Sequence, residues 1–392
     1  MGHAEEFVER VREALQDRRM SIRSASRALS YDHAYLSRVL AGKQEPSPEL
    51  TDRLRRLLRL GEDDLPAGRA PAPPASVADF LPAGDPLAPL DVRTGRRIGT
   101  NAVSALSQRV HALRLADDVV YGHDLIGPAL RELRGAVRLY RESTHTEDVG
   151  RELLRVIGEL GQIAGWVASD AGRYDEAERI YRLGLSAAHT AGDATLASQL
   201  LGSLAYQLSN TGQESAAREM ALAALDGAPG APPRARALNF DRVAWAYAMT
   251  GQAQSAMRAV GDAGEALAGH GGESEPSWLY WVDAGELEVM EARVHTELHR
   301  PLRAVPLLRR VLDQYDTTHT RELALYSSWL AMALADANEP EEAAATTQRV
   351  ITLSSAGSSE RAALRSSALL HRLEKFRDVP EVAALLAEHR VA

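Results

Sequence analysis

The sequence feature that most constrains the fold is a degenerate internal repeat in the C-terminal part of the chain. Three segments share one pattern, 165–185, 205–225 and 244–264, and two weaker copies follow at 292–312 and 331–351. Aligning the copies places one turn residue of each in register, with spacings of 40, 39, 48 and 39 residues: Gly172, Gly212, Gly251, His299 and Asn338. A period of this length is typical of helical repeat arrays, in which each unit packs against its neighbours.

Small residues recur at fixed distances from these turns. Each copy has Gly or Ala seven residues before the turn and Ala five residues after it: Gly165, Ala205, Ala244, Ala292, Ala331, and Ala177, Ala217, Ala256, Ala304, Ala343. The turn that ends a helix favours positive φ, which Gly adopts freely and Asn tolerates best among the other residues. Small residues at the contact points let two helices approach closely. The pattern therefore predicts stacked helix hairpins.

This pattern resembles tetratricopeptide repeats, with a period longer than the usual one of about 34 residues. Helical segments at 101–120 and 125–141 add another pair before the first clear copy, and 359–389 caps the end. We expect about five to seven helix pairs that curl around a concave surface, as such arrays do. Convincing two-residue hairpin turns are absent from the sequence, so the fold class is all-α.

A proline-rich segment divides the chain. Seven of the 18 prolines fall between Gly61 and Leu90, and proline blocks helix propagation and favours extended chain. We therefore expect three parts: a small helical bundle over 1–62, a Pro/Ala-rich linker over 63–90, and an α-solenoid of repeats over 91–392 that serves ligand sensing and dimerisation.

The first sixty residues contain the signals of four short helices. The first carries Val8 and Val11, the second runs from Ile22 to Leu29 with Ser21 as its N-cap, and a sharp turn follows at Ser30-Tyr31. The third is capped by Asp32, buries Leu36, Val39 and Leu40, and is stopped by Gly42; the last runs over 50–58. Two short helices joined by a tight turn within a bundle form a helix-turn-helix.

The stretch from Met20 to Leu58 is similar to the Xre/Cro-type helix-turn-helix of bacterial repressors, and LSRVLAGKQEPS is its most specific part. The match covers about residues 5–60, with Ser26 where Ala is usual and Leu40 where Glu is common. The resemblance implies that the third helix enters the major groove of double-stranded operator DNA. It assigns base reading to His33, Ala34, Ser37 and Arg38, and phosphate contacts to Arg23, Arg27, Lys43 and Gln44. The alternative is a small bundle with a solvated charged face.

The charge distribution agrees with DNA binding at the N-terminal end. The chain carries a net charge of −9, but residues 1–60 hold 12 basic against 9 acidic residues. The first sixty residues therefore carry +3 and the remainder −12. Attraction to phosphate depends on the local patch more than on the sum.

In tetratricopeptide repeats the first helix of each pair lines the concave groove. Carried over to this chain, that rule gives a ligand groove of Gln162, Trp166, Asp170, Gln199, Tyr206, Asn210, Asp241, Trp245 and Arg293. Amide and aromatic side chains together suit a peptide or a small signalling molecule. The alternative is that Trp166 and Trp245 only pack between repeats. Similarly, the run Trp278 to Asp283 is a helix contact, a dimer surface or a pocket wall.

Catalytic motifs are absent from the sequence. There is no cysteine, no phosphate-binding P-loop and no nucleophile elbow. His295 and His299 have a zinc-compatible spacing, but the zincin glutamate is misplaced, and we expect Asp117-Asp118 to be solvated or to cap a helix. We therefore expect no enzyme activity, no cofactor and no metal. Without a signal peptide or a long apolar run, we also expect a cytoplasmic protein that does not contact membranes.

The combined architecture resembles the peptide-sensing RRNPP regulators and, still more, the helix-turn-helix and repeat regulators of actinobacteria. This resemblance implies a homodimeric transcriptional regulator that binds operator DNA and whose repeat domain senses a peptide or a small signalling molecule. The alternative function is a protein–protein adaptor, in which the repeats bind a partner protein and the N-terminal bundle is auxiliary or vestigial.

Overall fold

In the computed structural model the chain divides into two compact units, residues 1–73 and 74–392, which are described separately. In the first unit the structure describes 8, 11–12, 14–15, 20–29, 33–41, 50, 53–54 and 57–58. In the second it describes 74–84, 86–87, 97–120, 122–269, 275–315, 319–355 and 360–389.

The first unit contains the two helices of the expected helix-turn-helix. Helix α2 spans Ile22–Leu29 and α3 spans His33–Leu40. The Oγ atom of Ser21 accepts a hydrogen bond from the amide of Ser24 at 3.1 Å, so Ser21 caps α2 as the sequence predicts. The described residues of 8–15 and 50–58 are helical as well. The turn at Ser30-Tyr31 and Gly42 lie outside the described residues.

The core of this unit comes from all four helical segments: Val8, Val11, Ala14, Leu15, Ala25, Leu29, Leu36, Val39, Leu40, Leu50, Leu54 and Leu58. Ser26 and Leu40, the two departures from the family pattern, are both buried. The guanidinium of Arg53 donates to the carbonyl of Leu29 at 2.9 Å, and that of Arg12 donates to the carbonyl of Leu40. These bonds tie the C-terminal ends of α2 and α3 to the flanking segments.

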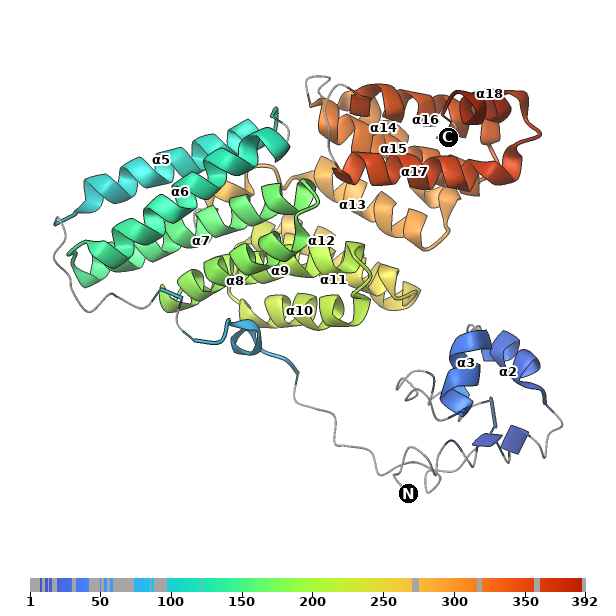
Figure 1. The fold of residues 1–392 in the computed structure, drawn as a ribbon, viewed down its shortest axis with the longest axis horizontal. Helices are drawn as coiled ribbons and strands as arrows, with labels where there is room; N and C mark the ends of the chain where they lie inside the picture. Colours follow the sequence, from blue (N-terminus) through green and yellow to red (C-terminus); the bar gives the residue numbers. More distant parts are fainter. Residues whose placement is uncertain are drawn as a thin grey trace. The chain divides into compact units, whose positions relative to one another are not determined.

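The second unit is an array of helix hairpins (Figure 1). In the part that the structure describes, seven pairs follow one another: α5 (Thr100–Asp117) with α6 (Gly122–Glu142), α7 (Glu147–Asp170) with α8 (Tyr174–Thr190), α9 (Ala194–Asn210) with α10 (Glu214–Gly227), α11 (Pro233–Met249) with α12 (Ala253–Ala268), α13 (Ala284–Glu297) with α14 (Pro301–Gln314), α15 (Thr320–Asp336) with α16 (Pro340–Ser355), and α17 (Glu360–Leu373) with α18 (Pro380–Glu388). The described residues form no β-strand, and only an isolated bridge joins Arg97 and Thr144. The all-α, solenoid-like fold class is confirmed.

The turns between paired helices have the backbone that the repeat alignment predicts. All five aligned residues have positive φ: Gly172 at 74°, Gly212 at 80°, Gly251 at 70°, His299 at 53° and Asn338 at 65°. His299 and Asn338 are the only residues other than glycine with positive φ in the described part of the chain. The alignment was therefore correct even where the sequence lacks glycine.

The small residues on either side of these turns lie at helix contacts. All nine aligned alanines are buried, at 0% or 1% exposure. At the tenth position, a Cβ atom built on Gly165 would lie 2.6 Å from the ring of Tyr181. Glycine is therefore required for the close approach of α7 and α8.

The helices form two layers. The first helices of successive pairs contact one another in order, from α5 through α7, α9, α11 and α13 to α15. From α6 to α16, each second helix packs against its own partner and against the first helix of the next pair, whereas α18 packs against α16. The first helices therefore form a continuous inner layer, which carries the candidate ligand site. No helix of the described part is long and apolar enough to cross a membrane.

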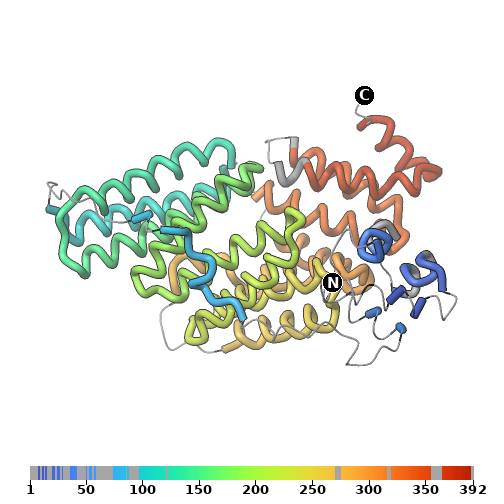
Figure 2. The backbone as a smooth tube through the Cα atoms, turned by 60° about the horizontal axis from the view of Figure 1, so that its bottom comes forward, coloured from blue at the N-terminus to red at the C-terminus, as the bar shows by residue number. Residues whose placement is uncertain are grey.

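The segment 74–84, which the sequence placed in the linker, lies on the repeat array (Figure 2). It contains the short 3-10 helix η2, Val77–Phe80, which contacts α9 and α10. The guanidinium of Arg182 on α8 donates to the carbonyl of Phe80 at 2.9 Å. This part of the proline-rich stretch is thus packed against the solenoid rather than extended away from it.

Candidate functional site

The four expected base-reading residues all belong to α3. Leu36, Val39 and Leu40 are buried, and Arg38 is exposed on the opposite side of this helix. Ser37 is half-buried, and the side chains of His33 and Ala34 lie outside the described residues. The helix therefore presents Arg38 to solvent, as a recognition helix presents its base-reading side chains.

The expected phosphate contacts are described only in part. Arg23 and Arg27 lie on α2, but their side chains are outside the described residues. Lys43 and Gln44 also lie outside them.

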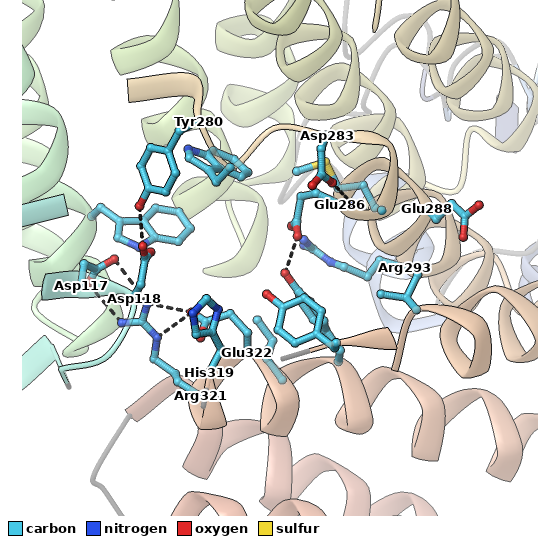
Figure 3. Close-up of a pocket in the computed structure, with 18 of the residues that line it drawn as sticks. Asp117, Asp118, Tyr280, Asp283, Glu286, Glu288, Arg293, His319, Arg321 and Glu322 are labelled. Atoms are coloured by element: carbon cyan, nitrogen blue, oxygen red, sulfur yellow. Dashed lines mark hydrogen bonds and ion pairs between the residues drawn. The ribbon is translucent and has the colours of Figure 1, made fainter. Parts of the chain in front are cut away.

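A cavity of about 700 Å³ lies on the inner layer of the second unit (Figure 3). Its walls come from α5, α7, α9, α11, α13 and α15, together with α14 and the segment around the 3-10 helix η3, Ser277–Leu279. Pockets for small ligands have volumes of roughly 300–1,000 Å³. The first helices of the pairs therefore line a ligand-sized pocket, as the resemblance to groove-binding repeats implies.

Five of the nine expected groove residues line this pocket: Gln162, Trp166, Gln199, Tyr206 and Arg293. They come from α7, α9 and α13. The rings of Trp166 and Tyr206 stack with their centroids 5.9 Å apart. Trp166 thus packs between repeats and also faces the pocket.

The other four expected residues do not line it. Asn210 is exposed at the end of α9, and its amide donates to the carbonyl of Tyr206. Trp245 is 2% exposed and packs edge-on against Trp329 at 5.5 Å, so the packing alternative holds for this residue. Asp241 and Asp170 are also buried, Asp241 beside Arg242 and Asp170 beside Arg321.

One end of the pocket is organised by Arg321. Its guanidinium donates to both carboxylate oxygens of Asp117, at 3.1 and 3.3 Å, and to Glu322 at 2.8 Å. Asp170 lies 3.7 Å away. Burial lowers the pKa of Arg321, but these carboxylates together raise it above its usual value. The ion pair between Arg321 and Asp117 joins α15 to α5, and the two residues are 204 positions apart in the sequence.

A second hydrogen bond closes the same end of the pocket. The hydroxyl of Tyr280, just after η3, donates to the carboxylate of Asp118 at 2.6 Å. Burial raises the pKa of Asp118. Trp278, Leu279 and Val282 are buried in the core, so the aromatic run is both core and pocket wall. The inserted residues of the long fourth repeat therefore reach back to the start of the array.

The opposite end of the pocket contains a half-buried glutamate, Glu286. The carboxylate of Asp283 caps α13 by accepting from the amide of Glu286 at 2.8 Å. The hydroxyl of Tyr326 donates to Glu286 at 2.6 Å. Burial raises the pKa of Glu286 to about 7, and the hydrogen bond from Tyr326 only partly offsets that effect. Glu286 therefore changes protonation state near neutral pH.

Arginine and aromatic side chains form the wall next to Glu286. The guanidinium carbons of Arg242 and Arg293 lie 4.5 and 5.1 Å from the ring centre of Tyr206. Arg293 also donates to the Tyr206 hydroxyl at 2.7 Å. Cations over aromatic faces gain electrostatic attraction at distances of about 6 Å or less.

Sequence reasoning missed the residues that close the pocket. Asp117 was expected to be solvated or to cap a helix, but it is 6% exposed and paired with Arg321. Asp118 does cap α5, and it also accepts from Tyr280. The aromatic run 278–281 was the one sequence signal that pointed to this region.

Comparison with known families identifies the first unit. The family model described as "Helix-turn-helix domain" matches residues 6–68. A comparison with curated proteins finds no match. The N-terminal unit is therefore a helix-turn-helix DNA-binding domain, which supports a DNA-binding regulator, followed by an all-helical, solenoid-like domain.

Proposed function

We propose that this chain is a sequence-specific, homodimeric transcriptional regulator whose pocket binds a peptide or a small signalling molecule and thereby changes operator affinity. The observation that carries the proposal is the combination in one chain of a helix-turn-helix domain and a ligand-sized pocket of about 700 Å³. We propose a sensing role for this pocket because amide, arginine and aromatic side chains line it.

The DNA-binding step uses α3 as the recognition helix. Arg38 is exposed on this helix, and an arginine can hold guanine through two hydrogen bonds. A dimer places two such helices about 34 Å apart, one turn of the duplex, so the operator contains two related half-sites.

The sensing step acts through the conformational population of the repeat domain. The pocket is lined by helices from α5, in the first pair, to α15, in the sixth, so a ligand that contacts both stabilises one arrangement of the array over others. Coupling between ligand and operator binding is typically worth about 1–3 kcal/mol.

Fluorescence anisotropy with DNA from the gene's own upstream region tests the DNA-binding step. The full chain is expected to bind this DNA more tightly than a scrambled duplex, and Arg38→Ala is expected to lose about 1–3 kcal/mol of that preference. Unchanged affinity and preference in a folded Arg38→Ala variant would show that α3 is not the recognition helix.

Thermal shift against secreted short peptides and small signalling molecules tests the sensing step, because a ligand that binds the folded chain stabilises it. A stabilising compound should also change operator affinity. If the upstream DNA is not bound and a partner protein is captured instead, the adaptor function replaces this proposal.

A further inference from the structure

Among the arginines that line the pocket, Arg293 differs from the others because no carboxylate lies within 4 Å of its guanidinium. Each of the other four has a carboxylate within 4 Å: Arg114 with Glu159, Arg242 with Asp241, Arg310 with Glu288 and Arg321 with Asp117. Arg293 is 5% exposed, and among the described residues it makes no ion pair within that distance. Its one polar contact there is the hydrogen bond to Tyr206. Arg293 is thus a buried cation without a carboxylate within 4 Å, and the carboxylates of Asp241, Glu286 and Glu297 act on its charge only from farther away.

The surroundings of Arg293 are aromatic and carry further positive charge. Its guanidinium carbon lies 4.7 Å from the ring centre of Trp245 and 5.3 Å from that of Trp329, and its Nε atom is buried without a hydrogen-bond partner. The guanidinium of Arg365 lies 3.6 Å from the same Trp329 ring. Aromatic faces attract a cation but do not neutralise it, and a buried charge is costly unless it is paired. Of these residues Arg293 lines the pocket, and its guanidinium therefore attracts an anion there.

We propose that Arg293 binds a carboxylate group of the pocket's ligand, and that this ligand is a monoanion with an apolar or aromatic body. The inference rests on the proposed function, because it names the chemistry of the molecule sensed in that pocket. One guanidinium that lines the pocket has no ion pair within 4 Å, and it matches one negative charge. A dianion such as a phosphate monoester would be repelled more strongly than a monoanion by Asp283, Glu286 and Glu288, which line the same pocket. Trp166, Trp278 and Trp281 supply the apolar surface for the body.

Three probes of the same shape separate charge from hydrophobic contact: 4-phenylbutyrate, its neutral amide 4-phenylbutyramide, and the cationic 4-phenylbutylamine. The three pocket tryptophans give the readout, quenching of tryptophan fluorescence, and calorimetry confirms it. The full chain is expected to bind the carboxylate at least about tenfold more tightly than the amide, and the amine most weakly. Fragments of this size bind in the millimolar range, so titrations extend to about 10 mM.

Variants of the chain then show whether Arg293 is the residue that binds the carboxylate of the probe. Arg293→Met keeps much of the side-chain length and removes the charge, so the preference for carboxylate over amide is expected to disappear. Arg293→Lys keeps the charge and is expected to retain part of the preference. The matched control is Arg310→Met, because Arg310 lines the same pocket but is paired with Glu288 and half exposed. It is expected to keep the preference.

The inference is overturned if the wild-type chain binds the amide or the amine as tightly as the carboxylate, if none of the three probes binds, or if the preference survives in Arg293→Met. Thermal melting shows whether Arg293→Met is folded; if it is not, the wild-type ranking and Arg293→Lys decide. None of these experiments measures operator binding, so their failure would not refute the DNA-binding step. Failure of the chain to bind its upstream DNA, in turn, would refute the proposed regulator while leaving the probe ranking intact.

Discussion

The buried ion pair between Arg321 and Asp117 gives the sharpest stability prediction. Arg321 on α15 donates two hydrogen bonds to Asp117 on α5 and two to Glu322. The substitution Arg321→Met keeps the approximate length of the side chain but removes the charge and all four hydrogen bonds. Asp117, which is 6% exposed, then keeps its burial without the guanidinium that stabilises its charged form.

The expected cost follows from measured cases of this kind. Removing one partner of a buried ion pair destabilises a protein by about 3–5 kcal/mol. The unfolding entropy is roughly 2 cal/mol/K per residue, so for the unit 74–392 it is about 0.7 kcal/mol/K near the midpoint. Division gives a decrease in Tm of about 4–7 °C. The decrease should be smaller at acidic pH, because the orphaned carboxylate is then protonated.

Differential scanning calorimetry at neutral and acidic pH measures both quantities. The matched control is Arg151→Met, because Arg151 is half exposed and pairs with Glu147 on its own helix. This change should cost less than about 1 kcal/mol. If the Tm of Arg321→Met matched that of the control, the link between α5 and α15 would contribute nothing to stability, and the reasoning would be refuted.

Two further changes test the helix contacts and the half-buried glutamate, Glu286. Gly165→Ala should destabilise the chain by about 1–3 kcal/mol in urea unfolding, because its Cβ meets Tyr181, whereas Gly135→Ala, with open space around it, should stabilise by up to about 1 kcal/mol. Equal effects of the two changes would contradict the packing argument. Glu286 has an ordinary pKa of 4.5 and a folded pKa of about 7, so its contribution to stability is full below pH 4.5 and is lost as the pH rises to 7. Glu286→Gln cannot ionise and should gain about 3 kcal/mol relative to wild type over that interval; a constant difference between the two unfolding curves would refute the shift.

Much of the fold could be predicted from the sequence because its signals are local. The Ser21 cap and the spacing of Leu36, Val39 and Leu40 each lie within a few residues of the structure they determine. The turns at His299 and Asn338 were predicted without glycine because the repeat fixed their register, and both have positive φ.

The pocket could be predicted only in part. Rules for the inner helix of each repeat found Tyr206 and Arg293, but they also gave Asn210, which lies beyond the pocket at the end of α9. The contact between Asp117 and Arg321 depends on the summed curvature of the array, and no local pattern encodes a distance over 204 residues. Nor does the sequence show which arginine lacks a carboxylate, because that depends on side-chain placement.

A genome-wide footprint of the DNA bound by the full chain, compared with that of Arg38→Ala, tests the central claim most directly. The account predicts discrete sites with two related half-sites about one helical turn apart, and loss of these sites in the variant. Absence of enriched sites, or an identical set of sites in a folded Arg38→Ala variant, would contradict it.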